Sequence, residues 1–471
     1  MRGAGHWAAA VALAAAAAAP CGDAQFTKSV GGLNYDGTLA HCNFAGTIRI
    51  KGASSMEPED TYFITAHQTR AAAELYISKL NKLACGVKVG GQNFTLELTS
   101  IEDESSKDNV AAIAQSLVDD VTADFLVGPY SSKLNDVYAS VINDTSPKVA
   151  VLAGASSTSV YAGRPHIFGT LPASRQFFRY AIPALIDMNA TRFGYIEEVG
   201  APMCSGVEAA LAEVGASSVA SVTVSSGPSE EELLNGIDEL KQNGTDIILT
   251  CIYNAACPVF VKGLRQRKYT PKALVMSLCA GTSAFLEEVG RDAEHIMGVT
   301  AWDKSLFASD PLINMTAYEF FYEIRNRIGA DAVYHTAASA GAISALVQAI
   351  QRADSIDPAA VAAELKLGGF QTVFGEVNFD NNNQFRDPYL LVQYDKSGNT
   401  PVIWPKNGLE MVYPMPTWQS QDCRASENCS DIGECQSDGS CLCPGDYEPS
   451  GYKCIIIPNE DHQQSPQVKA V

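Results

Sequence analysis

The sequence predicts an α/β protein with two doubly wound parallel-sheet lobes and a small disulfide-rich C-terminal module. From residue 46 onward, short β-branched or apolar runs alternate with segments of helical spacing, as expected for parallel strands joined by helical crossovers. The chain has 471 residues, of which 46% are hydrophobic, and this is enough for more than one domain. Six cysteines between residues 423 and 454 mark the end of the chain as a separate unit.

Nine of the apolar runs are predicted as strands, and two sheets accommodate them better than one. The predicted strands are residues 47–51, 94–101, 123–128, 148–154, 192–198, 221–226, 246–252, 273–278 and 296–302. The predicted helices are residues 67–84, 109–121, 133–143, 175–189, 206–215, 230–244, 258–268, 337–353 and 357–367. Asn and Gly turns between alternating runs predict a closing antiparallel hairpin over residues 375–405.

The N-terminus predicts a secretory signal peptide over residues 1–24. Arg2 precedes an apolar, Ala-rich stretch, and small residues lead to a cleavage site near Ala24. A lipoprotein anchor on Cys21 is the alternative, but Pro20 stands where such signals have a small residue. Cleavage would leave twelve of the thirteen cysteines, an even number that suits a disulfide-bonded protein.

Six glycosylation sequons support passage through a eukaryotic secretory pathway. They are Asn93, Asn143, Asn189, Asn243, Asn314 and Asn428. No later apolar run has the roughly 18 residues of a membrane-spanning helix, so we expect a protein that is secreted or lies on the extracellular face of the plasma membrane. The net charge of −20 offers no basic surface for nucleic acid or an anionic membrane.

Three predicted strands of the first sheet end in turns of small polar residues: Gly52–Ser55, Gly128–Ser132 and Gly154–Ser157. In parallel sheets, ligands bind at the carboxyl ends of the strands, where small residues let backbone N–H groups approach a polar group. The turns therefore predict a site for a small polar ligand. The alternative is that Ser131 or Ser132 simply caps the following helix.

Catalysis is not predicted. The run Gly281–Ala284 resembles the nucleophile motif of subtilisin-like proteases, but none of the seven histidines is followed by glycine, as such an enzyme needs. The sequence also contains no G-x-S-x-G elbow, P-loop or H-E-x-x-H motif. We expect no metal and no cofactor.

Ordered segments resemble the type I periplasmic-binding-protein family, especially its branched-chain amino-acid and amide-binding members, which are related to receptor ligand-binding regions. The matching segments include "SIEDESSKDNVAAIAQSLV", "ADFLVGPYSS", "VAVLAGASS" and "FGTLPASRQFFRYA". The resemblance covers residues 44–410 and implies two lobes joined by crossing strands around a ligand cleft. Lobe 1 would comprise residues 44–170 and 303–354, and lobe 2 residues 171–302 and 355–410. Receptor relatives also suggest a homodimer.

The resemblance implies which residues contact the ligand. In lobe 1 they are Ser131, Ser132, Gly154, Ala155, Ser156 and Ser157. In lobe 2 they are Glu198 and, at other strand ends, Tyr253, Cys279 and Trp302. Pro202 and Met203 stand where relatives have an aromatic, and Cys279 stands near the usual second acid. An unpaired ammonium group in a closed cleft is costly, so these departures weigh against an α-amino acid. Tyr253 and Trp302 could instead be packing aromatics.

The C-terminal cysteine spacing resembles an EGF-like module over residues 419–457, with a flexible tail at 458–471. The implied pairs are Cys423–Cys435, Cys429–Cys441 and Cys443–Cys454. A zinc site is less consistent, because C-x2-C pairs are missing. Receptor-type relatives imply a bridge between Cys42 and Cys85. Cys251 and Cys257 span a short loop and could pair, which would leave Cys204 for Cys279, but the sequence leaves the pairing of these four cysteines open.

Together these patterns predict extracellular binding of a small polar ligand, an amino acid, an amide or a similar compound, by a solute-binding protein or receptor ectodomain. The alternative is a secreted adhesion or matrix protein with a degenerate cleft, in which the EGF-like module contacts a protein partner.

Overall fold

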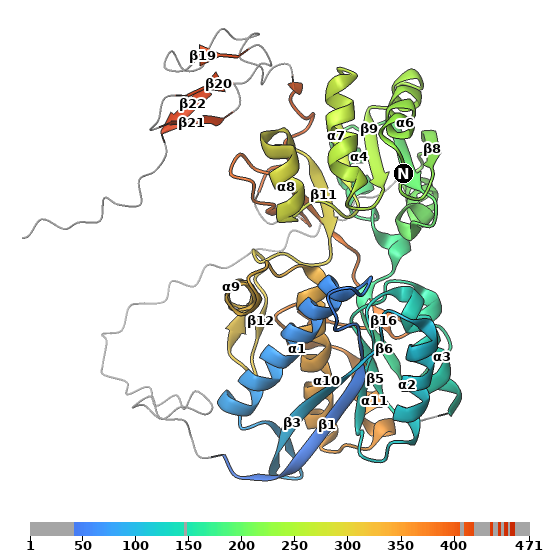
Figure 1. Ribbon diagram of the computed structural model, residues 1–471, viewed down its shortest axis with the longest axis vertical. Helices are drawn as coiled ribbons and strands as arrows, with labels where there is room; N and C mark the ends of the chain where they lie inside the picture. Colours follow the sequence, from blue (N-terminus) through green and yellow to red (C-terminus); the bar gives the residue numbers. More distant parts are fainter. Residues whose placement is uncertain are drawn as a thin grey trace, which may run out of the picture.

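A computed structural model describes residues 42–145, 148–405, 409–418, 434–436, 441–443, 447–450 and 453–456. These residues form two α/β lobes, each built on a seven-stranded sheet, which confirms the predicted fold class (Figure 1). The predicted signal peptide and C-terminal tail lie outside the described residues. In the part of the chain that is described, no helix has the length and apolar character needed to span a membrane.

The sheet of lobe 1 has the order β16-β6-β5-β4-β1-β3-β2, with every neighbouring pair parallel except β2 and β3. In this order the strands are Gln384–Phe385, Ile167–Pro172, Ala150–Leu152, Phe125–Val127, Phe44–Ser54, Gln92–Glu102 and Val87–Val89. Helices α1 (Phe63–Leu83) and α10 (Tyr334–Ala353) cover one face. Helices α2 (Lys107–Asp119) and α3 (Ser132–Thr145) cover the other.

Alternation along the strands fills both cores of lobe 1. The consecutive residues Phe125 and Leu126 of β4 are both fully buried, and they belong to opposite cores, as the two-residue period of a strand requires. Alanines such as Ala72 and Ala338 line the contact between α1 and α10. Their short side chains let the two helices pack closely against each other and against the sheet.

The sheet of lobe 2 has the order β18-β17-β11-β10-β9-β7-β8 and is parallel except for the two strands at the β18 edge. In this order the strands are Val402–Trp404, Leu390–Gln393, Met297–Thr300, Ala273–Met276, Ile247–Cys251, Phe193–Glu198 and Ser218–Val224. Helices α6 (Glu230–Gln242), α7 (Ala256–Gln266) and α8 (Ser283–Val289) pack into one core. Helices α4 (Ala181–Ile186) and α5 (Val207–Glu213) pack into the core on the other face.

The chain passes between the two sheets after β6, after β11 and between β16 and β17. Our assignment of residues 355–410 to lobe 2 was therefore wrong in its first half. Helix α11 (Pro358–Leu367) packs on α10, and β16 pairs with β6. These contacts place residues 355–385 in lobe 1. Lobe 2 also extends beyond residue 410, because Trp418 is buried in its core.

All nine predicted strands are present, but β2 and β6 were missed and the predicted closing hairpin is divided. Within it, β15 (Gly375–Val377) pairs with β14 (Phe370–Thr372), β16 joins lobe 1, and only β17 and β18 form a hairpin. Gly169 weakens the strand pattern of β6 in the sequence. Its structural reason is the ring of Tyr161, which occupies the space where a Cβ would project.

The remaining elements lie between the main strands and at the C-terminus. Between β11 and α10 are β12 (Ser309–Asp310), β13 (Met315–Thr316) and α9 (Ala317–Ile328), which packs on α1. At the C-terminus, β19 (Glu434–Cys435) pairs with β20 (Cys441–Leu442), and β21 (Tyr447–Ser450) pairs with β22 (Lys453–Ile456). Cys441 and Cys443 are disulfide-bonded. The EGF-like pairing, which involves Cys423 and Cys429 outside the described residues, remains a prediction.

Candidate functional site

Two of the predicted serine turns meet at the carboxyl ends of β4 and β5, which are parallel neighbours. The backbone N–H of Ser131 donates to the carbonyl of Gly154 over 3.2 Å. The Ser132 Oγ accepts the backbone N–H groups of Ser156 and Ser157 over 3.1 and 3.2 Å. The two turns are thus joined into one surface of small polar residues, which we call the serine edge of lobe 1.

At the serine edge, a serine side chain can cap the following helix and still offer its hydroxyl proton to a ligand. The Ser131 Oγ accepts the backbone N–H of Leu134 over 3.3 Å, which caps α3. Below it, the buried amide of Asn135 donates to the carbonyls of Pro129 and Ser131 over 2.7 and 2.9 Å. In the contacts of Ser131 and Ser132 the hydroxyl oxygen is the acceptor, so their protons stay available to donate to a ligand.

Gly154 and Ala155 position the edge and are themselves buried. A Cβ on Gly154 would lie 2.9 Å from the Cα of Tyr130 and would overlap the carbonyl oxygen of Pro129. The carbonyl of Ala155 accepts the phenol of Tyr161 over 2.7 Å. These two residues allow the turns to approach each other, while the half-buried Ser156 and Ser157 present side chains.

The first Gly-Ala-Ser-Ser turn has a structural role. Ser55 is fully buried, and its hydroxyl donates to the Asp103 carboxylate over 2.7 Å. The backbone N–H of Asp103 in turn donates to the carbonyl of Ser54 over 3.2 Å. Ser55 therefore anchors the loop between β3 and α2, whereas Ser54 of the same turn lines the pocket described below, and a ligand role for this turn remains a prediction.

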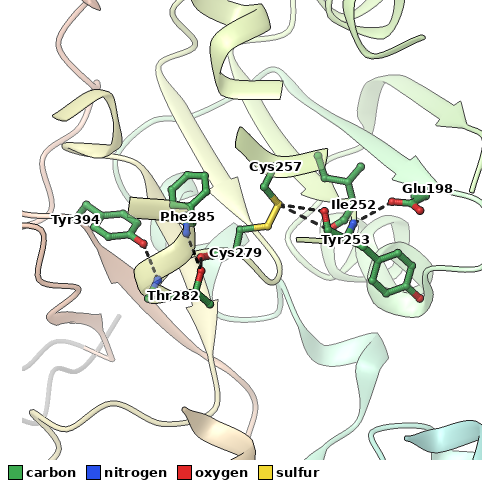
Figure 2. The surroundings of a disulfide bond; sticks show 9 residues. Glu198, Ile252, Tyr253, Cys257, Cys279, Thr282, Phe285 and Tyr394 are labelled. Atoms are coloured by element: carbon green, nitrogen blue, oxygen red, sulfur yellow. Dashed lines mark hydrogen bonds between the residues drawn. A yellow bond between two sulfur atoms is a disulfide. The ribbon is translucent and has the colours of Figure 1, made fainter. Parts of the chain in front are cut away.

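In lobe 2, Glu198 is committed to the backbone. Its side chain is buried, and its carboxylate accepts the N–H of Gly227 over 2.8 Å and that of Tyr253 over 3.0 Å. The carboxylate therefore ties the end of β7 to the loops that follow β8 and β9. Tyr253, by contrast, is 42% exposed, and in Figure 2 its ring points away from the neighbouring disulfide.

Two other predicted contacts of lobe 2 are not available to a ligand. Cys279 is bonded to Cys257 and is buried, so it offers no thiol. Trp302 is buried, donates its indole N–H to the carbonyl of Val373 over 2.8 Å and meets the ring of Phe320 edge to face. These contacts agree with the alternative that Trp302 is a packing aromatic.

The disulfides of lobe 2 differ from the predicted pairs. Cys204 is bonded to Cys251, and Cys257 to Cys279 (Figure 2), in place of Cys251–Cys257 and Cys204–Cys279. The two bonds connect the loop after β7, the end of β9, the start of α7 and the loop after β10. They therefore cross-link the strand ends of lobe 2 in series. In lobe 1, Cys42 is bonded to Cys85 with their Cα atoms 5.3 Å apart.

Sequence reasoning missed an aromatic group beside the serine edge. The ring centroids of Tyr62 and Tyr130 lie 5.9 Å apart at an interplanar angle of 71°, and those of Tyr130 and His335 lie 5.1 Å apart at 83°. We call these three residues the aromatic corner. The available signal was Tyr130 in "GPYSS", at the end of a predicted strand, and Tyr62 in "DTYF", just before a predicted helix.

Burial keeps two side chains of the aromatic corner, His335 and Tyr130, uncharged. Burial lowers the pKa of His335 to about 3 and raises the pKa of Tyr130 to about 12, so both side chains are neutral at physiological pH. Tyr253 of lobe 2 is an electrostatic neighbour of both Tyr62 and Tyr130, and each contact raises the pKa of a phenol. In the fold, Tyr253 follows the carboxyl end of β9, and its hydroxyl donates to the carbonyl of Gly200 over 3.4 Å.

A pocket opens between the strand ends of lobe 1 and helices α1 and α10, next to Pro129 and Gly154. Its polar lining comprises Ser54, Thr69, Arg70, Ser100 and Ser339. Arg70 is the cation of this lining, and its Nε lies 3.8 Å from the carboxylate of Glu74. The described part of the chain contains no group of three or more His, Cys, Asp or Glu side chains that could hold a metal ion.

Comparisons with known proteins agree with this architecture. A putative branched-chain amino-acid ABC transporter protein from Rhodospirillum rubrum superposes with a TM-score of 0.64 at 18% identity, covering 76% of this chain and 100% of that one. A branched-chain amino-acid substrate-binding protein from Streptococcus pneumoniae, solved with isoleucine, gives a TM-score of 0.62 at 14% identity, covering 78% and 100%. The family model described as "Periplasmic binding protein" matches residues 61–399. The chain therefore belongs to the periplasmic-binding-protein family.

Proposed function

We propose that the chain is an extracellular protein that closes its two lobes around a small polar ligand such as an amino acid, an amide or a similar compound. The observation that carries the proposal is the serine edge of lobe 1, which lies at the carboxyl ends of β4 and β5; in lobe 2 the exposed ring of Tyr253 follows the carboxyl end of β9. Family members bind small ligands and are not enzymes, which supports binding as the function.

The mechanism is a shift between open and closed arrangements of the lobes. A ligand that contacts both lobes favours the closed arrangement by its differential affinity. The three chain segments that cross between the sheets supply the hinge. Closure would place the ligand between the serine hydroxyls of lobe 1 and Tyr253.

An extracellular location is supported by the positions of the sequons and disulfides. Asn143, Asn189, Asn243 and Asn314 are exposed, as glycosylation requires. The three disulfides of the two lobes are typical of oxidising compartments. Mass spectrometry of the protein secreted by a eukaryotic host would detect the glycans; a fully unglycosylated product would contradict this part of the proposal.

Ligand binding is tested by thermal unfolding of the secreted protein against amino acids, amides, sugars and nucleosides. A ligand present at 100 times its dissociation constant stabilises the protein by about 2.7 kcal/mol. Ser156→Leu should abolish the response, because the side chain lies on the serine edge. Ser217→Leu, at an exposed position just before β8, should preserve it. An equal response of both variants would refute the site.

The adhesion alternative is favoured by one observation, the loss of Glu198, Cys279 and Trp302 as ligand contacts in lobe 2. In that case the cysteine-rich C-terminus would carry the function. Deletion of residues 419–471 distinguishes the two functions: it should leave small-ligand binding intact under our proposal, and it should remove cell or matrix attachment under the alternative.

A further inference from the structure

We propose, building on the binding function above, that the ligand carries a quaternary ammonium head that is enclosed by the aromatic corner and Tyr253, and a carboxylate that meets the serine edge. The proposal rests on two features. One is the arrangement of the rings in the aromatic corner, and the other is the carboxylate of Glu198, which is already hydrogen-bonded to two backbone N–H groups.

The rings of the aromatic corner form adjoining walls. Tyr62 meets Tyr130 at 71°, and Tyr130 meets His335 at 83°. A flat ligand prefers two parallel rings between which it can stack, whereas rings near right angles enclose a compact, roughly spherical group. A trimethylammonium head has that shape, and cages of aromatic rings bind such heads through cation–π attraction.

Tyr253 supplies the wall from lobe 2. Its backbone N–H is fixed by Glu198, and the next residues lead to Cys257, whose disulfide to Cys279 anchors the start of α7 (Figure 2). Tyr253 follows the carboxyl end of β9, and its ring is 42% exposed, so it is available to a ligand at the strand ends of lobe 2. Closing the lobes would then complete the cage.

A primary ammonium group fits this site poorly. It carries three N–H donors, each of which needs an acceptor once water is excluded. The carboxylate expected to serve it, Glu198, is only 4% exposed and accepts two backbone N–H groups. A quaternary ammonium group has no N–H, so the neutral faces of Tyr62, Tyr130 and His335 suffice.

The other end of the ligand is acidic in this proposal. The hydroxyl oxygens of Ser131 and Ser132 accept backbone N–H groups, so their protons are available to an acceptor such as a carboxylate oxygen. Arg70 lines the adjoining pocket and adds positive charge behind the serine edge. The pocket and the aromatic corner therefore discriminate between the two ends of a zwitterion.

The test compares trimethylglycine with 3,3-dimethylbutanoate, which has the same shape but a carbon in place of the charged nitrogen. Calorimetric titration of the full secreted chain should give at least about tenfold tighter binding for trimethylglycine. Equal affinity, or tighter binding of the carbon analogue, overturns the proposal. Binding of an unmethylated amino acid or an amide but not of trimethylglycine overturns it too, while the proposed binding function stands. A lack of response to every compound would count against both.

Variants of Tyr253 separate the ring from its hydroxyl. Tyr253→Phe keeps the aromatic face and should keep trimethylglycine affinity within about threefold, whereas Tyr253→Leu should lower it at least about tenfold. The exposed position of the side chain makes both variants compatible with folding, which the unfolding midpoint without ligand checks. Equal losses in Phe and Leu variants would contradict an aromatic cage.

Discussion

The two lobes hold their facing edges by different means. In lobe 1, the Ser132 hydroxyl oxygen accepts the backbone N–H groups of Ser156 and Ser157 and so joins the turns that follow β4 and β5, while Asn135 holds the first of these turns by donating to its carbonyls. In lobe 2, the bonds Cys204–Cys251 and Cys257–Cys279 link the corresponding loops covalently. Hydrogen bonds can rearrange when a ligand arrives, whereas disulfides fix the loops beforehand. The difference suggests that lobe 2 is a preorganised platform and that lobe 1 adapts to the ligand.

The largest effect is expected from removing a disulfide of lobe 2. Cys204–Cys251 and Cys42–Cys85 separate their cysteines by 47 and 43 residues. Replacing either pair by alanines should therefore lower the free energy of unfolding by a similar amount, about 4 kcal/mol by loop entropy. Only the lobe 2 pair lies among the loops of the facing edge. Its loss should weaken ligand binding as well, measured by titration well below the unfolding midpoint. Equal ligand affinity in both double variants would contradict a preorganised platform.

Gly154→Ala in lobe 1 is expected to lower the free energy of unfolding by less than removal of a disulfide does. The new Cβ would lie 2.9 Å from the Cα of Tyr130 and overlap the Pro129 carbonyl, and backbone atoms cannot move aside cheaply. The free energy of unfolding should fall by about 1–3 kcal/mol, and ligand binding should be lost. The control is Gly46→Ala at the start of β1, where only the Phe94 ring lies near, at 3.3 Å. Chemical denaturation of both variants checks the difference.

Ser132→Ala probes the hydrogen bonds that join the two turns. It leaves the backbone N–H groups of Ser156 and Ser157 without their acceptor, so the free energy of unfolding should fall by about 1–2 kcal/mol. Ser116→Ala is the control, because that hydroxyl only donates back to the carbonyl of Ile113 in the same helix. Hydrogen exchange at Ser156 and Ser157 should accelerate only in the first variant; unchanged protection would show that the serine edge does not depend on Ser132.

The sequence predicted the sheets well because their information is local. The apolar runs mark the parallel strands, serine turns follow β4 and β5, and the structure places these two strands side by side as expected. The sequence could not show which polar side chains are already hydrogen-bonded to backbone groups. Glu198 looks like a ligand contact until its two backbone donors are known. The pairing of Cys204, Cys251, Cys257 and Cys279 likewise depends on the distances between loops.

The aromatic corner was missed for a related reason. Tyr62 and Tyr130 are 68 positions apart in sequence order, and His335 follows from a distant helix, so no window of sequence holds them together. Only the crossing of the chain between lobes brings α10 beside the first strands. Spatial convergence of this kind sets the chemistry of the site, while the local pattern sets only the scaffold.

The smallest predicted effect concerns His335, and it tests whether the aromatic corner is as dry as its packing implies. Burial lowers the pKa of His335 to about 3, so the folded protein keeps it neutral while the unfolded chain protonates it near pH 6.5. The unfolded state then binds more protons, and stability falls as the pH drops below 6.5. Its ring neighbours Tyr130 and Tyr334 have raised pKa values and do not titrate in this range. Between pH 8 and pH 6 the free energy of unfolding of the wild type should fall by about 0.8 kcal/mol more than that of His335→Gln. Urea denaturation at both pH values measures the difference. If the free energy of unfolding depends on pH equally in the wild type and the variant, water reaches His335 and the aromatic corner already opens in the unliganded protein.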